Sequence, residues 1–89
     1  MKSCFVTIVN RLGLHARAAT RLVNHASAFS SEITVRKGAR AVNGKSIMGI
    51  LTLAAATGTE LTIEADGADE EQALDALAGL IADRFGEDE

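Results

Sequence analysis

Two stretches of this sequence repeat apolar residues at steps of three and four, the spacing of one buried face of a helix. The first stripe follows Ala16 and contains Ala19, Leu22, Val23, Ala26 and Phe29. The second consists of Ala73, Leu74, Leu77, Leu80, Ile81 and Phe85. Each stripe predicts an amphipathic helix, the first over residues 16–27, that has to cover an apolar surface formed elsewhere in the chain.

Stretches outside these helices alternate apolar and polar residues, as half-buried strands do. Residues 4–8, 32–36 and 60–65 show this pattern, and a short strand is expected through Ala41 and Val42. Lys37-Gly38 marks a hairpin turn, and the apolar run that follows Ser46 predicts a short helix with Ile50 and Leu53 facing the core. Strands with one apolar face form an antiparallel sheet that helices cover on one side. We therefore expect residues 1–89 to form a single α/β (α+β) domain, a two-layer open-faced sandwich. Its four-stranded antiparallel sheet has three helices on one face, in the order βαββαβα.

The last helix is expected to begin near Asp69, with Gln72 completing a capping-box pair. The residues after it, Gly86-Glu87-Asp88-Glu89, are expected to be frayed.

Composition limits what such a chain can do. A chain of 89 residues buries about 60–65% of its unfolded surface, so an exposed site is expected rather than a deep cavity. The absence of Trp and Tyr argues against stacking on single-stranded nucleic acid. The one cysteine, Cys4, forms no disulfide within the chain and is expected to be a buried hydrophobe. We find no signal peptide or membrane span, and expect a cytoplasmic protein without membrane insertion.

Charge is distributed unevenly along the sequence. Eight basic residues and one acid precede Ser46, whereas one basic residue and eleven acids lie from Ser46 onward. A basic half is one feature of nucleic-acid binders, and a small nucleic-acid-binding domain is one alternative. Because these basic residues are dispersed, we interpret the positive field near His15 as steering acidic protein partners, and expect no nucleic acid.

The stretch Gly13-Leu14-His15-Ala16-Arg17 places an imidazole between a glycine turn and the start of the first helix. The first turn of a helix offers unpaired amide N–H groups and the positive end of the dipole, which stabilise an anion. His15 is expected at or beside the N-cap, close to the amides of Ala16 and Arg17. A neutral imidazole nitrogen is a nucleophile near pH 7, so this place suits a phosphoryl group.

Other chemistry for His15 is disfavoured by its neighbours in sequence. No second His, Cys or carboxylate stands nearby at a metal-ligand spacing, so no metal is expected. A Ser-His-Asp arrangement is also hard to build, because no acidic residue precedes Glu32. His25 lies off the buried stripe and is expected to be a surface residue.

The residues around His15, with Ala18 and Ala19 after them, resemble the active-site motif of the HPr family. These are the histidine-containing phosphocarrier proteins of the phosphoenolpyruvate-dependent sugar phosphotransferase system. The stretch Asn43-Gly44-Lys45-Ser46-Ile47-Met48-Gly49-Ile50-Leu51 resembles the second motif of that family. Residues 58–63 and 67–73 resemble its last strand and the start of its last helix. Many members have proline where this chain has Ala18. Proline in a first helical turn removes only an amide that was unpaired anyway, so alanine is physically acceptable there.

The resemblance implies a phosphocarrier rather than an enzyme, with no cofactor. His15 would accept a phosphoryl group on Nδ1 from phosphorylated enzyme I, which takes it from phosphoenolpyruvate. It would then pass the group to EIIA-type proteins of a sugar or nitrogen-linked phosphotransferase system. The backbone amides of Ala16 and Arg17 and the Arg17 guanidinium would stabilise the phosphate, and the chain is expected to be a monomer.

The resemblance also makes Ser46 a possible substrate of an HPr kinase/phosphorylase. A serine before a helical run is usually an N-cap, and a phosphate there adds about two negative charges. The alternative function is therefore a regulatory interaction module that acts through phosphorylation of Ser46. In either case the partner interface is expected on the outward faces of the first two helices. It comprises Leu14, Ala16, Thr20, Arg21, Asn24, Ser27, Ile47, Met48 and Leu51.

Overall fold

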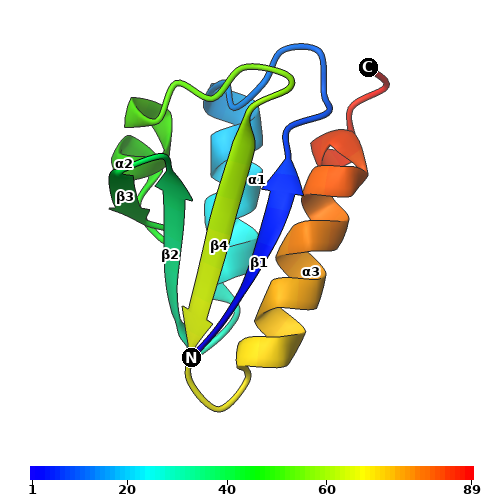
Figure 1. Cartoon of the computed structure of the whole chain (residues 1–89). Coiled ribbons are helices and arrows are strands. Elements are labelled where there is room, and N and C mark those ends of the chain that lie inside the picture. Colours follow the sequence, from blue (N-terminus) through cyan, green and yellow to red (C-terminus); the bar gives the residue numbers. More distant parts are fainter.

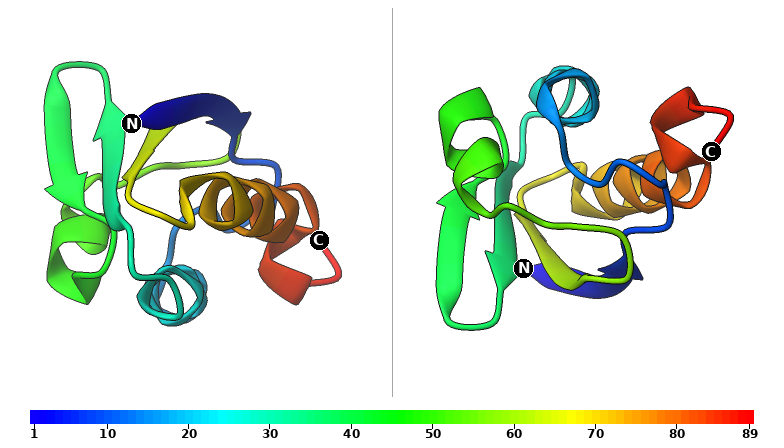
Figure 2. Two further views of the ribbon diagram at one scale, coloured as in Figure 1. Left: turned by 90° about the horizontal axis from the view of Figure 1, so that it is seen from below. Right: turned by 90° about the horizontal axis from the view of Figure 1, so that it is seen from above.

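The helices of the protein lie on one face of a four-stranded antiparallel sheet, and the other face of the sheet carries no helix (Figure 1). The computed structural model describes residues 1–89. In chain order the elements are β1 (Lys2–Thr7), α1 (Ala16–Ser27), β2 (Glu32–Lys37), β3 (Arg40–Asn43), α2 (Ile47–Thr52), β4 (Glu60–Asp66), α3 (Glu70–Ala82) and the 3₁₀ turn η1 (Arg84–Gly86). The views along the sheet in Figure 2 show the two layers edge on. The predicted order βαββαβα and the predicted sandwich are confirmed.

The strand that enters the sheet last along the chain lies inside it, because the strand order is β1-β4-β2-β3. Ile63 of β4 is opposite Cys4 of β1 on one side and Val35 of β2 on the other. Ile63 and Val35 are fully buried against the helices. Period-two alternation therefore produces one apolar face, as the sequence predicts.

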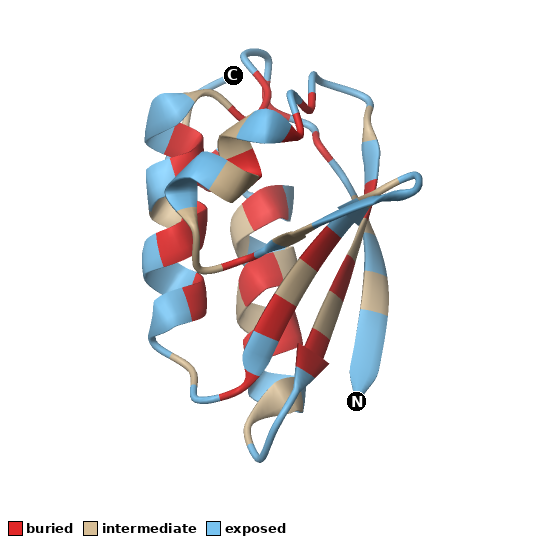
Figure 3. Ribbon diagram, turned by 90° about the vertical axis from the view of Figure 1, so that its left-hand side faces the viewer, coloured by how far each residue is buried: buried red, intermediate tan, exposed pale blue.

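The core fills the space between this face and the helices, and the buried residues of the helices and of the two inner strands, β2 and β4, line up along it (Figure 3). Leu22 of α1 and Leu77 of α3 are buried, and the two helices contact each other over the sheet. Ile50 and Leu53 are also buried, as predicted for the short helix. No helix combines the length and apolarity that crossing a membrane requires.

Three predicted core residues are only half-buried: Cys4, Phe29 and Leu80. Cys4 lies on β1, which is an edge strand of the sheet, so one flank of the strand is not covered by a neighbour. Burial of the thiol raises the pKa of Cys4, and the negative charge of Asp75 raises it further.

The start of the last helix differs from the predicted capping box. The carboxylate of Asp69 accepts hydrogen bonds from the backbone N–H groups of Ser30 and Ser31, at 2.9 and 3.0 Å, and from the Ser31 hydroxyl. It therefore makes no capping bond to its own helix, and Gln72 is exposed. The Asp69 side chain instead connects α3 to the loop between α1 and β2.

Candidate functional site

The loop between β1 and α1 is held in a conformation that only glycine adopts easily at residue 13. Gly13 has φ +68°, and a Cβ atom there would lie 2.5 Å from the Ala55 carbonyl oxygen. The same oxygen accepts a hydrogen bond from the Leu14 N–H at 2.8 Å. The side-chain amide of Asn10 donates to the Gly13 carbonyl, also at 2.8 Å. These contacts fix the chain directly before His15.

His15 is the N-cap of α1, as predicted. Its backbone is extended, with φ −76° and ψ 178°, and its Nδ1 accepts a hydrogen bond from the Arg17 N–H at 3.3 Å. The His15 carbonyl begins the helix by accepting from the Ala19 N–H at 2.8 Å. Nδ1 therefore lies at the first turn of α1, where a helix has amides without intrahelical partners. The imidazole is 28% exposed, so the ring remains near solvent.

The segment 86–89 is not frayed but returns to His15. Arg84 and Phe85 have φ +57° and +56°, and these left-handed residues reverse the chain after α3. The Phe85 side chain is buried and anchors the reversal, although it belongs to the turn rather than to the predicted helical stripe. Beyond it, the Glu87 carboxylate bonds to Nε2 of His15, and Arg11 pairs with Glu89 at 2.6 Å. The prediction failed because these partners lie far away in the sequence.

Glu87 is bound from two sides. One carboxylate oxygen contacts His15, and the other accepts a hydrogen bond at 3.0 Å from the amide of Asn10, whose side chain is fully buried. Partial burial of the carboxylate raises the pKa of Glu87. The hydrogen bonds from Asn10 and His15, together with the coulombic attraction of Arg21 and of the His15 ring in its protonated form, outweigh that effect, so the pKa of Glu87 is lowered. The carboxylate is therefore ionised at neutral pH.

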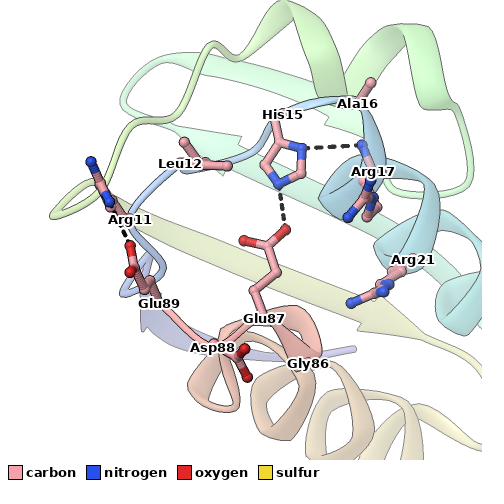
Figure 4. A pocket seen from close by; sticks show the side chains of 10 residues that line it. All are labelled: Arg11, Leu12, His15, Ala16, Arg17, Arg21, Gly86, Glu87, Asp88 and Glu89. Carbon is pink, nitrogen blue, oxygen red and sulfur yellow. Dashed lines mark hydrogen bonds and ion pairs between the residues drawn. The ribbon is translucent and has the colours of Figure 1, made fainter.

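An open hollow of about 750 Å³ surrounds these groups (Figure 4). It is lined by Arg11, Leu12, His15, Ala16, Arg17, Arg21, Gly86, Glu87, Asp88 and Glu89. Figure 4 shows the two ring nitrogens of His15 facing different partners, with Nδ1 toward the start of α1 and Nε2 toward Glu87. No group of three or more His, Cys, Asp and Glu side chains has an arrangement that could hold a metal ion.

The two arginines of α1 that line the hollow have different roles. Arg17 is exposed and takes part in none of the ion pairs of the chain. Arg21 is half-buried, and its guanidinium donates to the Phe85 carbonyl. Arg17 is thus the arginine whose charge remains available to an anion at His15.

The predicted partner interface is largely exposed, with one correction. Leu14 is 6% exposed and belongs to the core, because its backbone is tied to Ala55 and its side chain turns inward. Arg21 and Leu51 are half-buried. The remaining predicted residues are exposed: Ala16, Thr20, Asn24, Ser27, Ile47 and Met48. Met48, at 73%, and Ile47, at 39%, are among the most exposed large apolar side chains of the helix layer.

Ser46 is the N-cap of α2, as predicted. Its hydroxyl accepts a hydrogen bond from the Gly49 N–H at 3.1 Å. Because α2 packs beside α1, Ser46 and His15 belong to two neighbouring helices. A change of charge at Ser46 would lie next to the exposed side chains of Ile47 and Met48.

Sequence reasoning missed Asn10, Leu12 and Glu87, and it also missed Arg11, Gly86, Asp88 and Glu89, which line the hollow as well. Leu12 is 68% exposed beside His15, and no periodic pattern includes it. A signal for Glu87 was present in the uneven charge distribution, since the acidic end of the chain is the natural partner of a basic site. Nothing in the sequence indicates that Asn10 would be the buried residue that binds both Glu87 and the loop before His15, at the Gly13 carbonyl.

Comparisons with known proteins agree with this geometry. Residues 2–83 match a family model described as the PTS HPr component phosphorylation site. The chain is 52% identical over 83 residues to the phosphocarrier protein HPr of Cupriavidus necator, covering 93% of each chain.

Solved structures agree as well. A crystal structure of HPr-C-His from Thermoanaerobacter tengcongensis superposes with a TM-score of 0.96 at 47% identity, covering 100% of both chains. A dimeric HPr structure from the same organism gives a TM-score of 0.79 at 48% identity over 98% of this chain and 100% of that chain. The protein therefore belongs to the HPr family, the phosphocarrier proteins of the phosphotransferase system, which carry a phosphoryl group and are not enzymes.

Proposed function

We propose that His15 is the phosphoryl acceptor of this phosphocarrier. It takes the group from a phosphohistidine on enzyme I and passes it to EIIA-type proteins in the cytoplasm. One observation carries the proposal: His15 caps α1 with a partly exposed ring, beside the Arg17 amide and the unpaired Arg17 guanidinium. The other histidine lacks this setting, since Nδ1 of His25 faces the Arg21 carbonyl inside the same helix.

The transfer needs little acid–base chemistry. The lone pair of Nδ1 leaves its hydrogen bond with the Arg17 N–H and attacks phosphorus in line, the N–P bond to the donor imidazole breaks, and the electron pair of that bond returns to the donor ring. The positive end of α1 and the Arg17 guanidinium stabilise the phosphoryl oxygens during the exchange. Because the hollow is open, the group remains accessible to the next acceptor. Moderate stabilisation suits a carrier, since tight binding of the phosphoryl group would stop onward transfer.

The test is phosphorylation with purified enzyme I and phosphoenolpyruvate, followed by intact mass measurement. We expect one added phosphoryl group that is labile in acid and stable in base. It should be absent from His15→Ala and present in the matched control His25→Ala. Unphosphorylated wild-type protein, or a group that survives in His15→Ala, would overturn the assignment.

Docking of both partners is proposed on the exposed faces of α1 and α2. The exposed apolar residues Leu12, Ile47 and Met48 lie around the polar face of α1, a combination typical of protein interfaces. We propose that the chain docks as a monomer. Light scattering at working concentration checks this, and a stable dimer would contradict it.

A second candidate function is regulation through Ser46 by an HPr kinase/phosphorylase. The observation that favours it is the position of the Ser46 hydroxyl at the start of α2, next to Ile47 and Met48 of the docking surface. A phosphate there would place negative charge beside residues that have to contact acidic partners. Incubation with such a kinase and ATP should add an acid-stable phosphate to the wild type and none to Ser46→Ala. No added phosphate on the wild type would dismiss this role.

A further inference from the structure

The reactivity of an imidazole depends on which ring nitrogen carries the proton. In the neutral ring one nitrogen is a donor and the other has the free lone pair. The Glu87 carboxylate, ionised at neutral pH, can only accept a hydrogen bond. Its contact with Nε2 of His15 therefore requires the proton on Nε2. Independently, Nδ1 accepts from the Arg17 N–H, which requires Nδ1 to be unprotonated.

The carboxylate that makes this contact is itself held in place. Its second oxygen binds the amide of Asn10, which is fully buried and also donates to the Gly13 carbonyl. The segment that carries it is fixed before Glu87 by buried Phe85 and after it by the Arg11–Glu89 pair. The Glu87 side chain is only 14% exposed, so water competes weakly for its hydrogen bonds.

We propose that Glu87 is a positioning residue for His15: it fixes the proton on Nε2 and so leaves Nδ1 as the atom that takes the phosphoryl group. This inference deepens the proposed function and rests on it. When the Nδ1–P bond forms, the proton stays on Nε2 and the ring becomes positively charged. Glu87 then faces that charge directly. The carboxylate thus serves the acceptor before transfer and the phosphorylated ring after it.

The first test measures the tautomer and needs no phosphoryl transfer. Nitrogen-15 NMR of the full chain, recorded along a pH series until the ring signals stop changing, distinguishes protonated from unprotonated nitrogens in the neutral rings. We expect His15 with the proton on Nε2. His25 is an internal control in the same spectrum, because its Nδ1 faces the Arg21 carbonyl at 2.9 Å and should carry the proton.

Three variants separate positioning from charge and from folding. Glu87→Ala should give a mixture of tautomers at His15 and slow phosphoryl acceptance about tenfold, the loss expected for one hydrogen bond to a charged group. Glu87→Gln keeps an oxygen acceptor and should restore most of the tautomer preference. Asp83→Ala removes the same charge from an exposed residue outside the hollow and should leave both measurements within about twofold of the wild type.

The behaviour of Glu87→Ala and of the wild type decides whether Glu87 positions His15. An unchanged tautomer in Glu87→Ala, with the chain still folded by circular dichroism, would overturn the proposal. Faster phosphorylation of Glu87→Ala would also overturn it, because Glu87 would then shield His15 rather than orient it. If the wild type has the expected tautomer but is never phosphorylated, the proposed function fails while the contact between Glu87 and His15 stands.

Discussion

At the scale of single residues, Gly13 decides how the chain enters α1. It combines a positive φ with a carbonyl oxygen 2.5 Å from the position that a Cβ would occupy. Gly13→Ala should therefore lower the free energy of unfolding by about 3 kcal/mol, from backbone strain and displacement of Ala55 together. The measurement is urea denaturation.

Gly38 provides the matched control, because it has φ +57° and open space around it. Gly38→Ala should cost only about 1–2 kcal/mol, from the left-handed backbone alone. Equal losses in both variants would mean that the close approach at Ala55 costs nothing.

Arg17 should affect transfer but not folding. Its side chain is exposed and unpaired, so Arg17→Ala should change the free energy of unfolding by less than about 0.5 kcal/mol. The rate of phosphorylation by enzyme I should fall about tenfold, since one charged donor to the phosphoryl group is lost. A large loss of stability would show that Arg17 supports the fold instead.

Asp69 makes stability depend on pH in the acid range. Hydrogen bonds from the Ser31 side chain and from the Ser30 and Ser31 backbone lower the pKa of Asp69 from 3.8 to about 2. A lowered pKa in the folded state stabilises it above the unfolded value of 3.8, and this contribution is lost as pH falls toward 2. Asp69→Asn should thus be less stable than wild type at neutral pH and should converge with it near pH 2.

The matched control is Asp83→Asn, which changes an exposed carboxyl without a side-chain hydrogen bond. Its stability relative to wild type should show no such convergence. Thermal unfolding followed across the acid range compares the three proteins. A constant difference between Asp69→Asn and wild type from neutral pH to about pH 2 would contradict the role of Asp69.

Some residues of the site could be predicted from their neighbours in the sequence, and others depend on partners that are distant in the sequence. His15 could be predicted because the glycine turn, the helix start and the apolar stripe all lie within a few positions of it. Glu87 could not, because its partner is 72 residues away and only the left-handed turn at Arg84 and Phe85 brings it back. A sequence contains no local signal for a contact of that range.

At the scale of elements, mutations of Ser46 can separate its capping of α2 from the effect of a negative charge on phosphoryl transfer. Its hydroxyl satisfies one amide of α2, at Gly49, and removal of a cap costs about 1 kcal/mol. Ser46→Ala should therefore lower stability by that amount and leave phosphorylation by enzyme I unchanged. Ser46→Asp keeps a capping oxygen and should retain stability, but its charge should slow the transfer. Identical transfer rates in both variants would limit Ser46 to its capping role.

The helices and strands could be predicted from the periodicity of apolar residues, but the contacts at their ends could not. The alternation around Ile63 and the stripe through Leu22 were sufficient to predict the sheet and α1, since burial of one face fixes both. The start of α3 was predicted with the wrong contact, because Asp69 binds Ser30 and Ser31 from a distant loop. Tertiary partners compete for the same side chains that local capping rules assign.

At the scale of the whole molecule, folding brings the acidic end of the sequence onto the basic start of α1. Glu87 and Glu89 are paired with His15 and Arg11, and Arg21 donates to the Phe85 carbonyl, which leaves Arg17 as the positive charge of the hollow without a partner. Encounter with an acidic partner should thus depend on a positive field that salt screens. The rate of phosphorylation should fall as ionic strength rises, and the fall should be shallower for Arg17→Ala. Arg40→Ala, an exposed change in β3, should keep the wild-type slope, and equal slopes in all three would contradict electrostatic steering by Arg17.

The two chain ends lie at opposite ends of the molecule, and the last residues line the hollow beside His15 (Figure 1). A label at residue 88 would therefore report on the hollow, whereas one attached before Met1 would be remote from it. Since the chain has no Trp or Tyr, Asp88→Trp would supply the only indole in the protein. Its fluorescence would follow partner docking and phosphorylation in real time, without a modification of the carrier's exposed helices.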